Sequence, residues 1–186
     1  DGGLSMAYNN ILNSKNLGDI VYNGSNRPKT FGYLLNNLSW RNLSLSFNIT
    51  YKLGYFFRNR SVNYSHILAG QLGHADYSKR WQKLGDEAFT NVPSFIYPLD
   101  VNRETFYEKS EILIEKGDHI RLQDIQLTFA LDNGLIKNFP FRQVRLYIIA
   151  SNLGILSRAN NKNIDPDAIL SAPASKVLSA GMQIHF

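Results

Sequence analysis

Few side chains in this sequence have the types and spacing that metal binding requires. His66, His74 and Asp76 could offer a metal ion two imidazoles and a carboxylate. Zinc sites usually place such ligands at short helical spacings, as in H-E-x-x-H, and two histidines eight residues apart in a loop lack that spacing. The sequence therefore predicts no metal site.

Carboxylates and nucleophiles give no clearer sign of catalysis. Asp86 and Glu87 are adjacent, with nothing else that suggests a paired general acid and base. Asp165-Pro166-Asp167 could bind calcium, but an Asx-type turn explains the same residues. The sequence has no G-x-S-x-G nucleophile elbow and no glycine loop that would cradle phosphate. We therefore expect neither an enzyme nor a bound cofactor.

Aromatic residues are the better candidates for contact with a ligand, and many lie between residues 58 and 118. This stretch shows no long alternation and contains Gly, Pro, Asn and charges of both signs. A loop of this length is usually functional. Four of its aromatics could stack on a sugar or pack against a peptide: Tyr77, Trp81, Phe95 and Tyr97. Packing of the loop against itself explains each of them as well.

The clearest element that could support such a loop is the stretch from Leu43 to Phe57. Every odd position in it is apolar, and the even positions as far as Gly54 are polar, charged or glycine. A period of two predicts a strand, and at ~3.3 Å per residue a strand of this length could cross a bilayer. Tyr55 and Phe57 would then lie in an interfacial aromatic girdle. The side chains expected to face lipid are Leu43, Leu45, Phe47, Ile49, Tyr51 and Leu53.

The last ten residues alternate in the same way and end in an aromatic residue. Ser179, Gly181, Gln183 and His185 form the polar face. An alternating last strand that ends in Phe resembles the assembly signal of Gram-negative outer-membrane β-barrels. An ordinary half-buried strand at the end of a soluble β-sandwich is the alternative. The residues of the expected barrel-assembly signal are Leu178, Ala180, Met182, Ile184 and Phe186.

Together these patterns predict an all-β, antiparallel fold. Arg41-Asn42 is short enough for a tight hairpin. A change of phase near Gln123-Asp124 predicts a β-bulge, because one extra residue restores a single apolar face. The expected strands are residues 30–40, 43–57, 119–131, 142–152 and 177–186.

The connections between these strands alternate between short and long. Outer-membrane barrels have short periplasmic turns and long external loops. We therefore expect residues 1–29, 58–118 and 153–176 to be extracellular and Phe186 to be periplasmic. Five strands are fewer than the about eight that close a transmembrane barrel. The chain, which begins at Asp1 without Met or a signal peptide, is therefore expected to be the carboxy-terminal part of a larger barrel.

Composition agrees with this interpretation and excludes several others. The hydrophobic content is 44% and no long apolar run exists, which argues against a helical membrane protein. Cysteine is absent, which excludes disulfides and thiolate metal sites. The net charge of +5 is not concentrated in a Lys/Arg cluster interleaved with stacking aromatics, so nucleic-acid binding is not expected.

A family resemblance becomes specific at EKGDHIRLQDIQLTF, residues 115–129. This segment looks like the "kGdyiRLkdisLsY" signature of SusC/RagA-type TonB-dependent outer-membrane transporters. Further blocks recur in the family's order: VYNGSNRPKTFG (21–32), RWQKLGDE (80–87), VRLYIIASNL (144–153), NIDPD (163–167) and LSAGMQIHF (178–186). One departure is Leu84, where Pro is common in the family, which leaves the role of that turn in doubt.

The resemblance implies roughly the final five strands of a 22-stranded barrel in the outer membrane of a Gram-negative bacterium. Such transporters actively import oligosaccharides or peptides beneath a SusD-like lipoprotein lid. TonB drives them by pulling on an amino-terminal plug domain, which this sequence lacks. Expected partners are therefore the lid, TonB through that missing region, the rest of the barrel, lipid and a glycan or peptide. Two rivals remain: a passive porin or autotransporter translocator, and a soluble carbohydrate-binding β-sandwich.

Overall fold

The computed structural model describes residues 6–16, 18, 20–131, 136 and 140–186. These residues form mostly strands, and they divide into two compact units. The first, which we call the sheet unit, comprises Ser25–Phe56 and Lys116–Phe186. The second, the helical unit, comprises Asp1–Gly24 and Phe57–Glu115. Each unit is described by itself.

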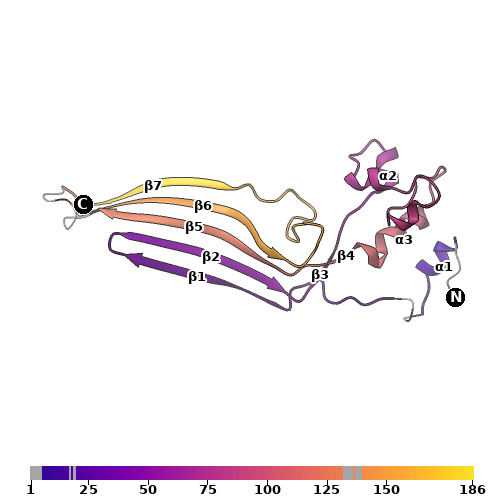
Figure 1. Cartoon of the computed structure of the whole chain (residues 1–186), viewed down its shortest axis with the longest axis horizontal. Coiled ribbons are helices and arrows are strands. Elements are labelled where there is room, and N and C mark those ends of the chain that lie inside the picture. Colours follow the sequence, from indigo (N-terminus) through magenta and orange to yellow (C-terminus); the bar gives the residue numbers. More distant parts are fainter. Residues whose placement is uncertain (1–5, 17, 19, 132–135, 137–139) are drawn as a thin grey trace. The chain divides into compact units, whose positions relative to one another are not determined.

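The sheet unit is built on one antiparallel sheet of five strands, as the alternation predicts (Figure 1). Its order is β1-β2-β5-β6-β7, so that β1 and β7 form the two edges. Arg41 and Asn42 make the predicted hairpin, because Trp40 pairs with Leu43 across them. The strands are β1 (Thr30–Trp40), β2 (Leu43–Leu53), β5 (His119–Leu131), β6 (Gln143–Arg158) and β7 (Val177–His185).

The strand predicted over residues 43–57 is wrong at its carboxyl end. β2 stops at Leu53, and a separate short strand β3 (Phe56–Arg58) pairs with β4 (Ile114–Lys116). Gly54 adopts a left-handed φ of 76°, which ends the ladder. The Asp118 carboxylate accepts hydrogen bonds from the backbone nitrogens of Gly54 (2.6 Å) and Tyr55 (3.3 Å), which fixes this turn.

Tyr55 and Phe57 are both buried, so neither lies in an exposed aromatic girdle. The Tyr55 ring packs over Gly117, where an added Cβ would come within 2.4 Å of the ring. The Tyr55 hydroxyl lies 3.3 Å from Nδ1 of His119. The apolar character of Tyr55 therefore reflects local packing rather than a position at a membrane interface.

The strand predicted over residues 142–152 runs six residues further, to Arg158. Asn152 (φ 56°) and Gly154 (φ 116°) are left-handed and allow β6 to bulge instead of ending. Between β5 and β2, Asp124 pairs with Asn48 and Leu122 with Ile49, so Gln123 is one extra residue on β5. The predicted bulge at Gln123 is therefore confirmed, and the expected loop 153–176 begins only at residue 159. The expected turn residues Asn133 and Gly134 lie outside the described residues.

The helical unit contains most of the stretch predicted as the loop 58–118, together with part of the loop 1–29. Its helices are α1 (Tyr8–Leu12), α2 (Tyr64–Leu68) and α3 (Val101–Lys109). Asp100 caps α3 by accepting from the backbone nitrogens of Asn102 and Arg103. The long loop is therefore a packed structure with a small core of its own, formed by Val62, Tyr64, Val92, Tyr107 and Leu113.

The five-stranded sheet separates apolar from polar side chains. Directly paired residues of antiparallel strands point to the same face, so the register identifies each face. One row across the sheet is Leu38, Leu45, Leu127, Ile148 and Ala180, and the neighbouring rows on that face are also largely apolar. The lipid-facing residues predicted on β2 fall on this apolar face, as do Leu178, Ala180, Met182 and Ile184 of β7, whereas Phe186 lies one residue beyond the end of β7. Many of its side chains are exposed, among them Trp40 (70%), Ile148 (50%) and Leu178 (75%).

Candidate functional site

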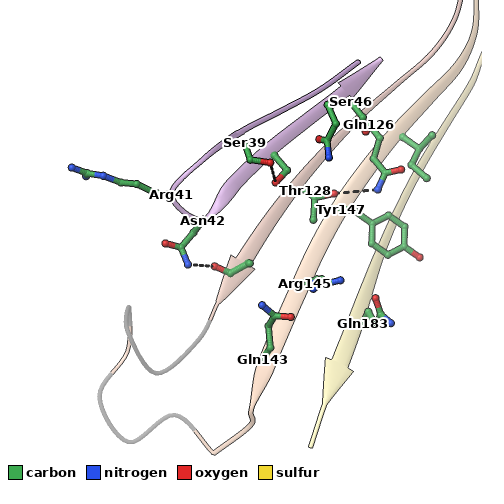
Figure 2. A pocket seen from close by; sticks show the side chains of 14 residues that line it. Ser39, Arg41, Asn42, Ser46, Gln126, Thr128, Gln143, Arg145, Tyr147 and Gln183 are labelled. Atoms are coloured by element: carbon green, nitrogen blue, oxygen red, sulfur yellow. Dashed lines mark hydrogen bonds between the residues drawn. The ribbon is translucent and has the colours of Figure 1, made fainter. Parts of the chain in front are cut away.

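The opposite, polar face of the sheet carries a hollow of about 650 Å³ near the β1–β2 hairpin (Figure 2). One row across it is Ser39, Ser44, Thr128, Tyr147 and Gly181. A Cβ added at Gly181 would lie 2.4 Å from the Tyr147 ring, so the tyrosine would have to move if this glycine were replaced. The lining residues are Asn37, Ser39, Arg41, Asn42, Ser44, Ser46, Gln126, Thr128, Ala130, Gln143, Arg145, Tyr147, Ile149 and Gln183.

Hydroxyls and amides dominate the chemistry of this hollow. Ser39 and Ser44 share a hydrogen bond of 3.1 Å, and Gln126 donates to Thr128 over 3.1 Å. The lining residues, all of them described, include no Asp, Glu or His. Such a surface can hydrogen-bond water or a polar solute, but it offers no general base.

A cluster of ion pairs lies on the same face, towards the other end of the strands. Arg121 on β5 donates to both carboxylate oxygens of Asp165, over 2.6 and 2.8 Å. Lys52 on β2 donates to Asp167 over 2.7 Å. Both bonds come from the one guanidinium nitrogen Nη2, the Arg121 and Asp165 side chains are each only 15% exposed, and hydrogen bonds between charged groups are stronger than those between neutral groups. The GDHIRL and NIDPD blocks of the sequence therefore meet here.

His119 completes this cluster from within the sheet unit. Its side chain is 2% exposed, and Nε2 lies 3.3 Å from the Asp167 carboxylate. Nδ1 lies 2.8 Å from the carbonyl oxygen of Gly117. The Tyr55 hydroxyl lies 3.3 Å from the same Nδ1. The imidazole thus links β5 to the segment that follows β6.

Opposing effects determine the pKa of Asp167. Burial of its carboxylate acts to raise the pKa, but the hydrogen bond from Lys52 and the charges of Lys52, His119 and Arg121 outweigh burial and lower it. A carboxyl group with a lowered pKa stabilises the folded state above its ordinary pKa of 3.8, and this stabilisation is lost as the pH falls through the lower folded value. The ion pair of Asp167 with Lys52 should therefore persist throughout the neutral and mildly acidic range.

In the helical unit, the four aromatics predicted to bind substrate differ in their contacts. Tyr77 and Phe95 both pack edge-on against buried Tyr64, with ring centroids 6.3 and 5.4 Å from it. Trp81 donates its indole N–H to the carbonyl oxygen of Lys83. Tyr97 is 81% exposed. Packing against Tyr64 accounts for Tyr77 and Phe95, and a binding role for the four remains a prediction.

A polar cluster surrounds Asp76 in the helical unit, and sequence reasoning, which considered His74 and Asp76 together, missed its other members Ser61 and Lys79. Asp76 accepts from Ser61 (2.8 Å) and from Lys79 (3.0 Å), and it lies 3.4 Å from His74. Burial acts to raise the pKa of Asp76, but hydrogen bonds from Lys79 and Ser61 and the charge of His74 lower it. The Ser61 hydroxyl is hydrogen-bonded both to the Asp76 carboxylate and to the Tyr107 hydroxyl. Because His74 contacts Asp76 and not Ser61, this cluster is no catalytic triad.

Three further observations bear on sites and membrane spans. His66 does not join His74 and Asp76 in the structure. Within the described ranges, no group of three or more His, Cys, Asp or Glu side chains could hold a metal ion. None of the described helices has the length and apolar character needed to cross a membrane.

Comparison with known proteins gives a structural likeness only. No protein-family model matches the chain, and no curated protein matches it. Among solved structures, the chain is similar to the RagAB peptide importer in its open-open state, with a TM-score of 0.60, 23% identity and coverage of 89% of this chain. The chain is also similar to the RagAB peptide transporter, with a TM-score of 0.62, and to the importer in its closed-closed state, with a TM-score of 0.61. Each of these matches covers 88% of this chain at 23% sequence identity.

This likeness concerns the fold. The chain spans only 18% of the length of each of these RagAB chains. Nearly all of this chain has a counterpart in them, so the match extends well beyond the five-stranded sheet. We conclude that the chain has the fold of one part of a RagAB transporter chain.

Proposed function

We propose that the sheet is five adjacent strands in the wall of a transmembrane β-barrel, within an outer-membrane active transporter that imports large nutrients. The observation that carries this proposal is the separation of the two faces. An exposed apolar face on a long antiparallel sheet suits contact with lipid, and the polar face with its hollow suits the lining of an aqueous passage. Ile149 on the polar face, and Phe31, Tyr33 and Leu35 on β1, depart from this pattern.

The height of the apolar face supports the proposal. On β5 it extends from Leu131 to Ile120, with one bulge between them. Ten alternating steps of ~3.4 Å, tilted by ~40°, project to roughly 26 Å, which matches the apolar band of about 25 Å found in outer-membrane barrels. A soluble β-sandwich has no need of an exposed apolar face this tall, because a second sheet covers that face.

The two edges of the sheet support a larger barrel. β1 and β7 each pair on one side only within the described chain. In a bilayer, each unpaired backbone group of such an edge would cost several kcal/mol. Strands from the rest of the protein would therefore continue the sheet on both sides, to the 22 strands that the SusC/RagA resemblance implies.

Substrate and partners follow from the same resemblance. The RagAB chains are described as peptide importers, which favours a peptide as the nutrient, with an oligosaccharide as the second candidate. The expected partners are a SusD-like surface lipoprotein and TonB, acting through the amino-terminal plug of such transporters. The helical unit would be extracellular, and its exposed aromatic Tyr97 is the most accessible of the four candidate contacts.

Uptake in cells that express the intact protein tests this function. We expect fluorescent peptides to accumulate several-fold above cells that lack the gene, and a protonophore to abolish the difference, because TonB needs the proton gradient. Labelled oligosaccharides of similar size test the second candidate. Uptake that persists with the protonophore would indicate a passive porin. Recovery of the protein in the soluble fraction would indicate a β-sandwich and contradict the proposal.

A further inference from the structure

The segment after β6 crosses the polar face of the sheet instead of extending away from it. Asp165 and Asp167 follow β6 in sequence, yet they contact side chains of β5 and β2. In the order β2-β5-β6 of the sheet, Lys52 is two strands away from β6. To reach it, the segment must fold back over β5.

The register identifies the face that it crosses. Lys52 pairs with His119, and Thr50 pairs with Arg121. Lys52 and Thr50 lie an even number of residues from Ser44 and Ser46, which line the hollow, and β2 itself contains no extra residue. All of these side chains therefore point to the polar face. The segment lies on the face that we assign to the passage.

Residues 160–167 also hold their own shape. The Asn160 side chain donates to the carbonyl oxygen of Ile164 and accepts from its backbone nitrogen, both over 3.0 Å. Arg158 donates to the carbonyl oxygen of Asn163 over 2.6 Å. Asp165 accepts from the backbone nitrogen of Asp167 over 3.0 Å. The two carboxylates are thus presented to the sheet by a braced turn.

We propose that residues 160–167 form a strap, clamped to β2 and β5 by Lys52, His119 and Arg121, that narrows the passage along the polar face. The clamp is supported by contacts within the sheet unit. The narrowing of the passage rests on the proposed function. Two carboxylates in the strap meet Lys52 and Arg121. The proposed restriction is one of solute size, which reagents of different length can measure.

A zero-length cross-link tests the clamp in the intact protein in its membrane. A carbodiimide should join Lys52 Nζ to Asp167, which are 2.7 Å apart, and mass spectrometry should find the linked peptides at every pH from 5 to 8. A cross-link between Lys79 and Asp76, whose side chains are 3.0 Å apart, is the positive control for the activity of the reagent. Lys52→Arg should keep the ion pair but lose the link. A Lys79–Asp76 link without a Lys52–Asp167 link would overturn the strap.

Thiol labelling tests whether the strap narrows the passage. The chain has no cysteine, so Thr50→Cys places a thiol beside Arg121 on the polar face. With an intact strap, a small maleimide should label it from outside at least tenfold faster than a maleimide on a long polyethylene glycol. Asp165→Asn with Asp167→Asn should largely remove that difference.

Asp124→Asn is the matched control for this labelling. Asp124 lies on the same face and contacts Asn48 at 3.3 Å, outside the strap, so this variant should keep the discrimination between the two reagents. Equal labelling of Thr50→Cys by both reagents, with or without the double substitution, would overturn the narrowing. Contact of the apolar face with lipid is measured in a separate experiment. A failure of the clamp or of the narrowing can therefore be distinguished from a failure of the barrel proposal.

Discussion

Ile148→Arg is expected to lower the free energy of unfolding in lipid by about 2–4 kcal/mol, the cost of a cationic side chain near the bilayer midplane of a barrel. Ile148 lies on the apolar face, near its middle, between Leu127 and Ala180. It is 50% exposed in the sheet unit, so no close packing within this chain would be lost. Leu45→Arg lies in the same row, and we expect a cost in the same range. Urea unfolding of the intact protein from lipid vesicles measures the effect.

Ile149→Arg is the matched control, since it makes the same chemical change one residue along the same strand. Ile149 lies on the polar face and lines the hollow. An arginine there would reach water, so we expect a cost within about 1 kcal/mol, close to that of ordinary surface substitutions. Equal costs at the two positions would contradict the assignment of the faces. In a soluble sheet, where Ile148 meets water, both substitutions would be mild.

Deletion of Phe186 is expected to reduce the amount of assembled protein in the outer membrane several-fold, while synthesis is unchanged. The terminal Phe completes the alternating apolar row of β7 that resembles the barrel-assembly signal, and its side chain is 91% exposed and available to a receptor. Protease protection and heat-modifiable migration of the membrane fraction measure assembly. Normal levels after the deletion would show that Phe186 is no part of such a signal.

Phe141→Leu separates recognition of Phe186 from simple packing. The rings of Phe141 and Phe186 meet edge-on, with centroids 5.6 Å apart. If Phe186 acts only through this contact, the loss of the Phe141 ring should impair assembly as much as the deletion does. If the assembly signal is what matters, Phe141→Leu should assemble almost normally.

The sheet was largely predictable because the alternation of apolar and polar residues within a strand is visible in the sequence of that strand alone. β2 and β5 begin where expected, since apolar residues at every second position mark a strand. β1 matches its predicted bounds although its alternation is imperfect. The bulge at Gln123 was predictable for the same reason, as a single extra residue shifts the phase of the pattern. In each case the signal is local and needs no knowledge of the neighbouring strand.

The end of β2 was not predictable because its cause is remote. Gly54 and Tyr55 are fixed by Asp118, 64 and 63 residues away in the sequence. Tyr55 is apolar because its ring packs over Gly117, so the alternation continues past the true end of the strand. The extension of β6 was missed because its bulge at Asn152 breaks the period, which on the sequence alone resembles the start of a loop.

The candidate site was predictable only in part. The polar residues at even positions of β2 indicated a wet face. The clamp joins blocks that are 44 residues apart, Arg121 and Asp165, and no pattern within either block reveals the pairing. The aromatic residues of the stretch 58–118 suggested a ligand surface, but the sequence alone does not reveal that Tyr77 and Phe95 both pack edge-on against Tyr64, which belongs to the small core of this stretch.

A spin-label scan of residues 145–150 in the intact protein in lipid tests the central claim most directly. One cysteine at a time would carry a nitroxide, whose collisions with lipid-soluble oxygen and with a water-soluble nickel complex are measured. We predict high oxygen access at residues 146, 148 and 150, and high nickel access at 145, 147 and 149. Equal access at neighbouring positions, or even-numbered residues shielded from both reagents, would contradict a barrel wall.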